Sequence, residues 1–314
     1  MVQAEQNQSD VVVFILLGFS DYPKLQVPLF LLFLTIYVIT VLGNLGMIVI
    51  IRINPKFHTP MYLFLSHLSF VDFSYSTIIT PKLLDILVVE DRSISFEGCI
   101  TQFAFAATCL VMETFLLSVM AYDRFVAICN PLLYTVIMSQ KRCGFLIAGA
   151  FIWGTISSLI FTYSLLILSF YGTNIINNFL CEYSAILSAS FSNKHVTEVI
   201  LFILSNFITF STLIIVLISY LFIFVTVLKM KSASGRHKAF STCASHLTAV
   251  TIFYGSILFL YCVPSSKNSW LLIRLGTVLC TVVIPMLNPL IYSLRNKDVK
   301  ETIRKLVEYE ICIN

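Results

Sequence analysis

The sequence predicts an all-α membrane protein, a bundle of seven transmembrane helices with its N-terminus outside the cell. Three observations predict this fold class: a low share of charged residues, seven long apolar runs, and a basic bias in alternate connections. The chain has 314 residues, of which 58% are hydrophobic and 11% charged, and its mean hydropathy is +0.91. Ordinary soluble domains carry roughly 25% charged residues, so this composition argues against a soluble protein.

Seven apolar runs approach or exceed the length of about 20 residues that a membrane-spanning helix needs. An apolar segment in lipid must satisfy its backbone polar groups internally, so each run is expected to be helical. The second run is the least apolar, because His67, Asp72 and Lys82 lie in or near it. The runs are 27–51, 59–83, 97–125, 143–168, 197–228, 239–262 and 271–294.

The orientation follows from the Lys and Arg residues of the connections, which are enriched on the cytoplasmic side of membrane proteins. With the N-terminus outside, the inner segments carry fourteen of the twenty basic residues. We therefore expect an extracellular N-terminus over 1–26, a transmembrane bundle over 27–294 and a cytoplasmic tail over 295–314. This orientation puts Asn7, in the only N-x-S/T sequon, outside the cell, where glycosylation takes place.

The tail after the last apolar run is basic and amphipathic. Its apolar residues recur at the spacing of one helical face, at Val299, Ile303, Leu306 and Val307. This pattern predicts a short helix lying on the inner leaflet, with membrane lipid as its partner.

Several functions are not indicated by the sequence. The basic residues lie between apolar runs rather than in one patch, so nucleic acid is not an expected partner. No nucleophile–base pair or glycine-rich phosphate loop occurs in an accessible segment, which argues against an enzyme. No Cys/His cluster has metal-ligand spacing, and no cofactor is expected. A secondary transporter would be expected to show internal repeats and matching broken helices, and neither is visible.

An acid and a base stand side by side where the third apolar run ends, in the stretch MAYDRFVAICNPLLY at 120–134. Charged side chains at the end of a membrane-spanning helix are costly, so a pair there indicates a functional site. The stretch resembles the inner end of the third helix of G-protein-coupled receptors. Its full fifteen-residue sequence resembles the olfactory receptor family in particular. KAFSTCASHL at 238–247 and PMLNPLIY at 285–292 resemble the same family in the expected order. The resemblance covers about 14–300.

The resemblance implies an odorant receptor in the plasma membrane of olfactory sensory neurons. Such a receptor binds a small odorant in the outer half of the bundle and activates a stimulatory, olfactory-type heterotrimeric G protein, which raises cyclic AMP. Two other classes of protein with seven helices fit less well. An amine receptor would normally have an Asp in the upper third helix, where 105–111 has no acid, and a retinal-type pump needs a lysine that 271–294 lacks.

The resemblance also implies which residues form the switch toward the G protein. In the closed state Asp123 should hold Arg124, and in the open state Tyr220 and Tyr292 should move toward Arg124. A proline in the N-P-x-x-Y motif kinks the seventh helix. The expected switch residues are Asp123, Arg124, Tyr220, Asn288, Pro289 and Tyr292.

Stripes of apolar residues on three helices are candidates for the ligand site. On the third helix they share one face, which by resemblance points into the pocket. The alternative is that these stripes serve only helix packing. Together they describe a cavity with a few hydroxyls and no charge, which predicts a small, neutral, mostly hydrophobic ligand. The candidates are Ala106, Ala107, Leu110, Val111, Ser205, Ile208, Tyr254, Ile257 and Tyr261.

Two carboxylates, Asp72 and Glu113, lie at membrane depth, where each needs a partner. They could bind a sodium ion, share a proton, or accept hydrogen bonds from Asn44 and Asn288. The resemblance favours a sodium or proton site that biases the inactive state, and a satisfied polar network is the alternative.

The resemblance implies a disulfide between Cys99 and Cys181, which ties the second outer loop to the third helix. The family usually has two further cysteines in this loop, where this chain has Tyr171 and Phe191. The loop is therefore expected to carry one disulfide rather than two. Phe125 is a smaller departure, since most relatives have tyrosine there, and we expect it at most to shift basal activity or coupling.

Overall fold

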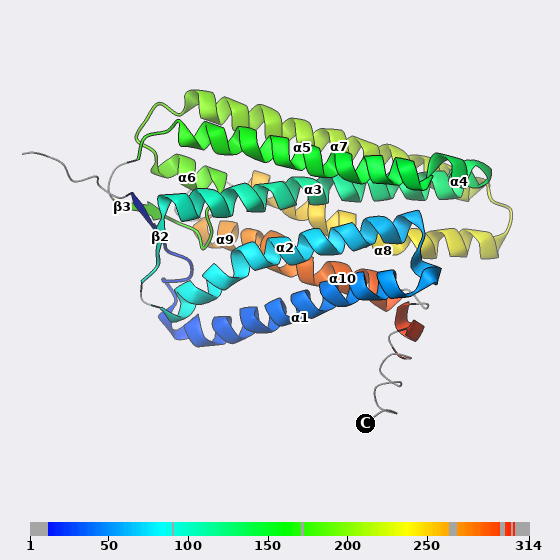
Figure 1. Cartoon of the computed structure of the whole chain (residues 1–314), viewed down its shortest axis with the longest axis horizontal. Coiled ribbons are helices and arrows are strands. Elements are labelled where there is room, and N and C mark those ends of the chain that lie inside the picture. Colours follow the sequence, from blue (N-terminus) through cyan, green and yellow to red (C-terminus); the bar gives the residue numbers. More distant parts are fainter. Residues whose placement is uncertain are drawn as a thin grey trace, which may run out of the picture.

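The computed structural model describes residues 12–89, 91–170, 173–263, 269–295, 299–302 and 304. Its long helices run side by side along the length of the molecule (Figure 1). The helices are α1 (Gln26–Ile53), α2 (Pro60–Val88), α3 (Phe96–Cys129), α4 (Tyr134–Ile137), α5 (Gln140–Leu166), α6 (Tyr183–Ala189), α7 (His195–Lys229), α8 (Ala233–Cys262), α9 (Trp270–Val278), the π-helical turn η5 (Leu279–Val283) and α10 (Ile284–Arg295). Single turns of 3-10 helix occur at Pro23–Leu25, Pro55–Phe57 and Pro131–Leu133.

Within the described residues, six helical spans are long and apolar enough to cross a membrane. Each matches one of the predicted runs: Pro23–Ile53, Phe96–Cys129, Gln140–Leu166, His195–Lys229, Cys243–Cys262 and Trp270–Ser293. The remaining run, 59–83, forms α2, which has 29 residues but is not among the six. Its polar residues lower its hydropathy, and Asp72, Ser76 and Thr80 are buried inside the bundle.

The helix α3 is the centre of the bundle. In its most apolar stretch 61% of the residues are buried, against 11% in the span that contains α1. It packs against α2, α5 and α7. The contact with α5 is close at Gly154, where a Cβ atom would lie 2.8 Å from Cγ of Met112. The helix α3 therefore contributes more of its surface to the bundle interior than α1 does.

The outward faces of the bundle are strongly apolar. On α1, α5 and α7 large side chains are exposed rather than packed, which is expected of helices whose outer solvent is lipid. Examples are Leu42, Phe145, Leu159, Phe202, Leu217 and Leu221.

A three-stranded sheet caps the end of the bundle where α3 begins (Figure 1). The central strand β1 (Val13–Leu16) pairs antiparallel with β2 (Ser93–Ser95) and parallel with β3 (Thr173–Ile176). Phe14 and Leu16 of β1 are fully buried. The sequence of 1–26 predicted only an extracellular terminus, and this sheet was not predicted. We call this end of the molecule the disulfide end, and the opposite end the Arg124 end.

Some sequence predictions fall on residues that the structure does not describe. Asn7 and Tyr171 lie outside the described residues, as does most of the predicted tail helix. Residues 299–302 and 304 of that helix are helical.

Candidate functional site

A disulfide joins Cys99, in the first turn of α3, to Cys181 in the segment between β3 and α6. The backbone N–H of Cys181 also donates to Oε1 of Gln102 (3.0 Å), and Nε2 of Gln102 donates to the carbonyl of Ile78 (3.4 Å). The loop is therefore held to α3 and, through Gln102, to α2.

Hydrogen bonds connect two segments of this loop, one at Ser169 and the other at 190–192. Phe191, at one of the two altered positions, is 73% exposed, and its backbone N–H donates to the carbonyl of Ser169 (3.3 Å). The backbone N–H of Ser169 donates to Oγ of Ser192 (2.9 Å), and the Ser190 and Ser192 hydroxyls lie 2.9 Å apart. This serine cluster draws the same two loop segments together without a covalent bond.

A half-buried acid that the sequence did not predict as a site residue, Glu182, lies directly after the disulfide. The Glu182 carboxyl accepts a hydrogen bond from the Ser184 hydroxyl (3.2 Å) and is also hydrogen-bonded by the side chain of Asn178. Burial raises the pKa of this carboxyl above its usual value, and the two hydrogen bonds oppose the shift. The residue keeps some accessible surface, although protein surrounds its carboxyl.

The structure brings most of the predicted ligand residues into the bundle interior. Ala106 and Val111 of α3 and Ile208 of α7 are buried, while Ala107, Leu110, Ser205 and Ile257 are half-buried. Tyr254 of α8 is buried, and its hydroxyl makes no hydrogen bond to any described residue, although it lies close to Thr212. Tyr261 differs from the rest, because it is 56% exposed in the last turn of α8.

The two membrane-depth carboxylates share one amide. Nδ2 of Asn288 donates to Oδ2 of Asp72 (2.9 Å) and to Oε1 of Glu113 (3.3 Å). Asn44 does not join them, because its amide donates to the carbonyls of Thr40 and Pro285 (3.0 Å each). Oδ1 of Asp72 and Oε2 of Glu113 are buried without a hydrogen bond to any described residue. These two oxygens are the ones free to meet a cation or a shared proton.

At the Arg124 end, Asp123 is fully buried and accepts hydrogen bonds through both oxygens. Nη2 and Nε of Arg124 donate to Oδ2 (2.7 and 3.1 Å). The Tyr134 hydroxyl donates to Oδ1 (2.8 Å) from the first residue of α4. Burial, followed by the Asp123 charge, raises the pKa of Tyr134, so its proton stays in this bond. Tyr134 lies within the stretch at 120–134, but its role as a partner of Asp123 was not predicted from the sequence.

A histidine links three helices next to this pair. The Tyr220 hydroxyl of α7 lies 2.6 Å from Nδ1 of His246 in α8, and Nε2 of His246 lies 3.0 Å from the carbonyl of Leu117 in α3. A carbonyl can only accept, so Nε2 carries the proton and Nδ1 accepts from the tyrosine. The buried Tyr292 hydroxyl makes no hydrogen bond to any described residue. Neither Tyr220 nor Tyr292 is hydrogen-bonded to Arg124 in this structure.

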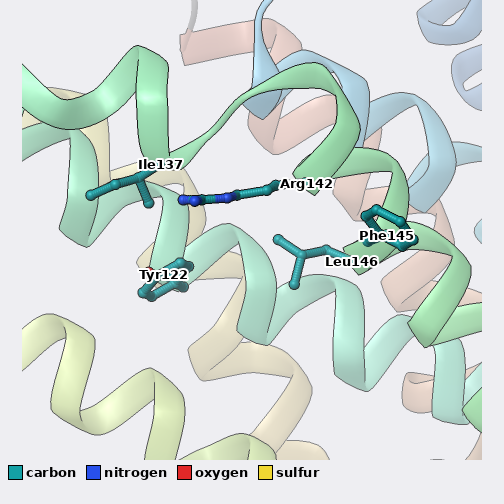
Figure 2. Close-up of a pocket in the computed structure, with 5 residues that line it drawn as sticks. All are labelled: Tyr122, Ile137, Arg142, Phe145 and Leu146. Atoms are coloured by element: carbon teal, nitrogen blue, oxygen red, sulfur yellow. The ribbon is translucent and has the colours of Figure 1, made fainter.

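An open pocket of about 260 Å³ lies at the Arg124 end, between α3, α4 and the start of α5. In Figure 2 the Arg142 side chain reaches toward Ile137, and Tyr122 belongs to α3. Phe145 and Leu146 complete the lining. None of the predicted ligand residues lines this pocket, so it is separate from the candidate ligand site.

The helix bundle has the fold of the rhodopsin-like receptors. Among solved structures, the chain is similar to squid rhodopsin, with a TM-score of 0.71 and 17% identity over 90% of this chain and 80% of that one. The olfactory receptor family model matches residues 33–309.

Relatives agree over almost the full length. Human olfactory receptor 5D18 is 63% identical over 99% of both chains, and mouse olfactory receptor 1165 is 61% identical over 97% of this chain and 96% of its own. The chain therefore belongs to the olfactory receptor family, which confirms the resemblance seen in its sequence. It is a receptor and not an enzyme.

Proposed function

We propose that this receptor lies in the plasma membrane of olfactory sensory neurons, binds small neutral hydrophobic odorants, and activates the stimulatory olfactory-type G protein. The resulting signal is a rise in cyclic AMP. The observation that carries this proposal is the Asp123–Arg124 pair, buried and closed by Tyr134 at one end of a receptor bundle. An arginine held in this way is a switch element that only an opened bundle would present to a partner.

The proposed topology has seven spans. Six of them are the apolar helical spans described above, and the seventh is α2, which is less apolar. Residues 1–26 are outside the cell, 27–294 form the bundle, and 295–314 form a cytoplasmic tail that contacts membrane lipid. In support, the bias of basic residues favours the Arg124 end as the cytoplasmic one. The Cys99–Cys181 disulfide then lies on the oxidising side, where such bonds persist.

The proposed ligand site lies between α3, α7 and α8, toward the disulfide end. Its apolar walls and the unpaired hydroxyl of Tyr254 suit a small molecule with one polar group. Tyr261 is proposed to lie near the entrance of the ligand site rather than inside it, since more than half of the residue is exposed. Affinity should be modest, because so small a ligand makes few contacts.

The proposed activation is a shift of population toward the open bundle, which the odorant drives only by its preference for that state. On opening, Arg124 leaves Asp123, and Tyr220 and Tyr292 turn toward it. Tyr220 must first release His246, so the bond between them stabilises the closed state. Asn288 and Pro289, one turn before Tyr292, connect this movement to the acid pair.

We further propose that Asp72 and Glu113 form a sodium or proton site that favours the closed state. Two like charges at this depth are costly, and a cation or shared proton between their unpartnered oxygens would relieve the cost. Asn288 donates to both acids and is the first residue of the N-P-x-x-Y motif. A sodium ion or proton bound to the acids would therefore act directly on this motif.

The test is a cyclic AMP assay in transfected cells, with surface expression measured in parallel. A panel matched in carbon number would compare neutral alcohols, ketones and esters with the corresponding amines and acids. Activation by neutral compounds is expected. A response confined to the charged compounds would contradict the proposed ligand class, and a receptor at the surface that no odorant couples to cyclic AMP would contradict the proposed signalling.

A further inference from the structure

The pocket at the Arg124 end has no part in the proposed mechanism. It has a volume of about 260 Å³ and lies between α3, α4 and the first turn of α5. Its lining is apolar except for Tyr122 and Arg142. The Arg142 side chain reaches toward Ile137 of α4 (Figure 2), so one guanidinium lies at the wall of a mostly apolar cavity.

The charge of Arg142 is not neutralised by any residue that the structure describes. Its exposed guanidinium makes no hydrogen bond or ion pair to a described residue, and the same is true of the ammonium group of Lys141. Asp123, the nearest acid in the sequence, is fully buried and already bonded to Arg124 and Tyr134. The first turn of α5 also holds no acid, although a helix N-terminus favours negative charge. An anion from outside the chain would neutralise this side of the pocket.

The pocket adjoins the lipid-facing surface of the bundle. Phe145, which lines it, is 77% exposed, and Ile152 and Leu159 are exposed farther along α5. These three residues recur at i, i+7 and i+14, so they form one apolar face of the helix. Lys141 and Arg142 stand just before this face begins. Basic side chains at such a boundary lie at the level of the phospholipid headgroups.

We propose that this pocket binds an anionic phospholipid of the inner leaflet, with the lipid phosphate at Arg142 and the start of an acyl chain against Ile137, Phe145 and Leu146. The inference rests on the proposed topology, which puts the pocket in the leaflet where anionic lipids are enriched.

The chemistry of the lining suits this ligand. A guanidinium can donate two parallel hydrogen bonds to a phosphate group. The Tyr122 hydroxyl is a further donor, because it makes no hydrogen bond to any described residue. The volume of about 260 Å³ lies below the usual range for a whole small molecule, so the pocket would hold only the headgroup region. The acyl chains would then lie along the apolar face of α5.

The experiment measures lipid binding to the purified full-length receptor in detergent micelles by native mass spectrometry. Phosphatidylserine and phosphatidylcholine with identical chains are offered together at equal concentration. The wild type should retain the serine lipid about fivefold more than the choline lipid. Arg142→Gln should abolish this preference, and its fold should survive because the side chain has no described partner to lose. Phe145→Ala keeps the charge but removes an exposed apolar wall, so it should retain less phosphatidylserine than the wild type.

The control is Arg236→Gln, which removes an exposed base near the start of α8, at the same end of the molecule, and should keep the wild-type preference. Equal losses in Arg142→Gln and Arg236→Gln would mean that only the total surface charge attracts the lipid, and would overturn the site. A wild type without a preference, or an Arg142→Gln variant that keeps it, would also overturn the site.

A further arm adds soluble glycerophosphoserine, which has the headgroup without the chains. It should not displace the lipid at equal concentration, and displacement would mean that the pocket takes a free anion rather than a phospholipid. The measurement uses neither odorant nor G protein. Failure of the lipid preference therefore leaves the proposed signalling intact, and a receptor without a cyclic AMP response leaves the lipid site intact.

Discussion

Asp21, in the segment after β1, pairs with Arg274 of α9 across 253 residues of sequence, with 2.7 Å between Oδ2 and Nη1. The Arg274 side chain is only 3% exposed, whereas that of Asp21 is 61% exposed. Arg274 also donates to the carbonyl of Asn177 (3.4 Å). One buried guanidinium therefore holds the N-terminal segment and the loop before α6 to the start of the last span.

Asp21→Asn should lower the melting temperature of the purified receptor by a few degrees. The substitution leaves a buried guanidinium with a neutral partner, which costs about 1 to 2 kcal/mol after allowance for the exposure of Asp21. Asp85→Asn is the matched control, since it breaks the Lys82–Asp85 pair within one helix, where the basic side chain is 23% exposed against 3% for Arg274, and it should cost less. Equal shifts in the two variants would mean that Arg274 does not depend on Asp21.

Arg124→Ala should abolish the odorant-driven rise in cyclic AMP while surface expression stays near that of the wild type. Asp123 keeps the Tyr134 hydroxyl as a partner, so the fold should survive the loss of the guanidinium. The measurement is cyclic AMP per receptor at the surface. Normal signalling in this variant would refute the switch role of Arg124.

Tyr134→Phe should raise basal cyclic AMP. The change removes one of the hydrogen bonds that hold Asp123 in the closed arrangement, and a bond to a charged acceptor contributes about 1.5 to 3 kcal/mol. The closed state should lose stability by an amount that shifts the closed-to-open ratio about tenfold or more. Tyr163→Phe, on an outward face of α5, is the control and should leave basal activity unchanged. A silent Tyr134→Phe variant would assign this tyrosine to packing alone.

Cys99→Ser and Cys181→Ser should each lose surface expression, and the double variant should lose no more than either single one. The two sulfurs form one bond, so removing the second partner has nothing further to break. Cys262→Ser, at an exposed free cysteine, should behave as the wild type. Additive losses would show that the two cysteines act independently.

Asp72→Asn should change basal activity or sodium sensitivity more than it changes the ranking of odorants. The variant removes a charge from the pair bridged by Asn288 and leaves the proposed ligand residues untouched. Dose responses at two sodium concentrations, with potassium replacing sodium, make the comparison. A reordered odorant ranking would instead put Asp72 in the ligand site.

The apolar runs predicted the helices well because lipid exposure leaves a strong compositional signal. The run at 97–125 became α3 (Phe96–Cys129), and the run at 197–228 became α7 (His195–Lys229). The weakest run, 59–83, also became a helix, but its buried polar residues keep α2 below the hydropathy of a typical span. Hydropathy measures what a helix contains and not which neighbours cover it.

The polar contacts were harder to predict, since they depend on where separate segments meet. Either Asn44 or Asn288 could have joined the acids, and only the packing of α10 decides for Asn288. Strands of three or four residues, paired across long stretches of chain, leave no periodic pattern to recognise.

The pairing of β1 also determines the order in which the protein can be completed during synthesis. The ribosome makes β1 first, yet Val13 has its partners at Ser95 and at Thr173, which emerge much later. Until then Phe14 and Leu16, buried in the finished receptor, have nothing to bury them. A stalled or truncated chain would therefore display an apolar N-terminal segment that a finished chain conceals.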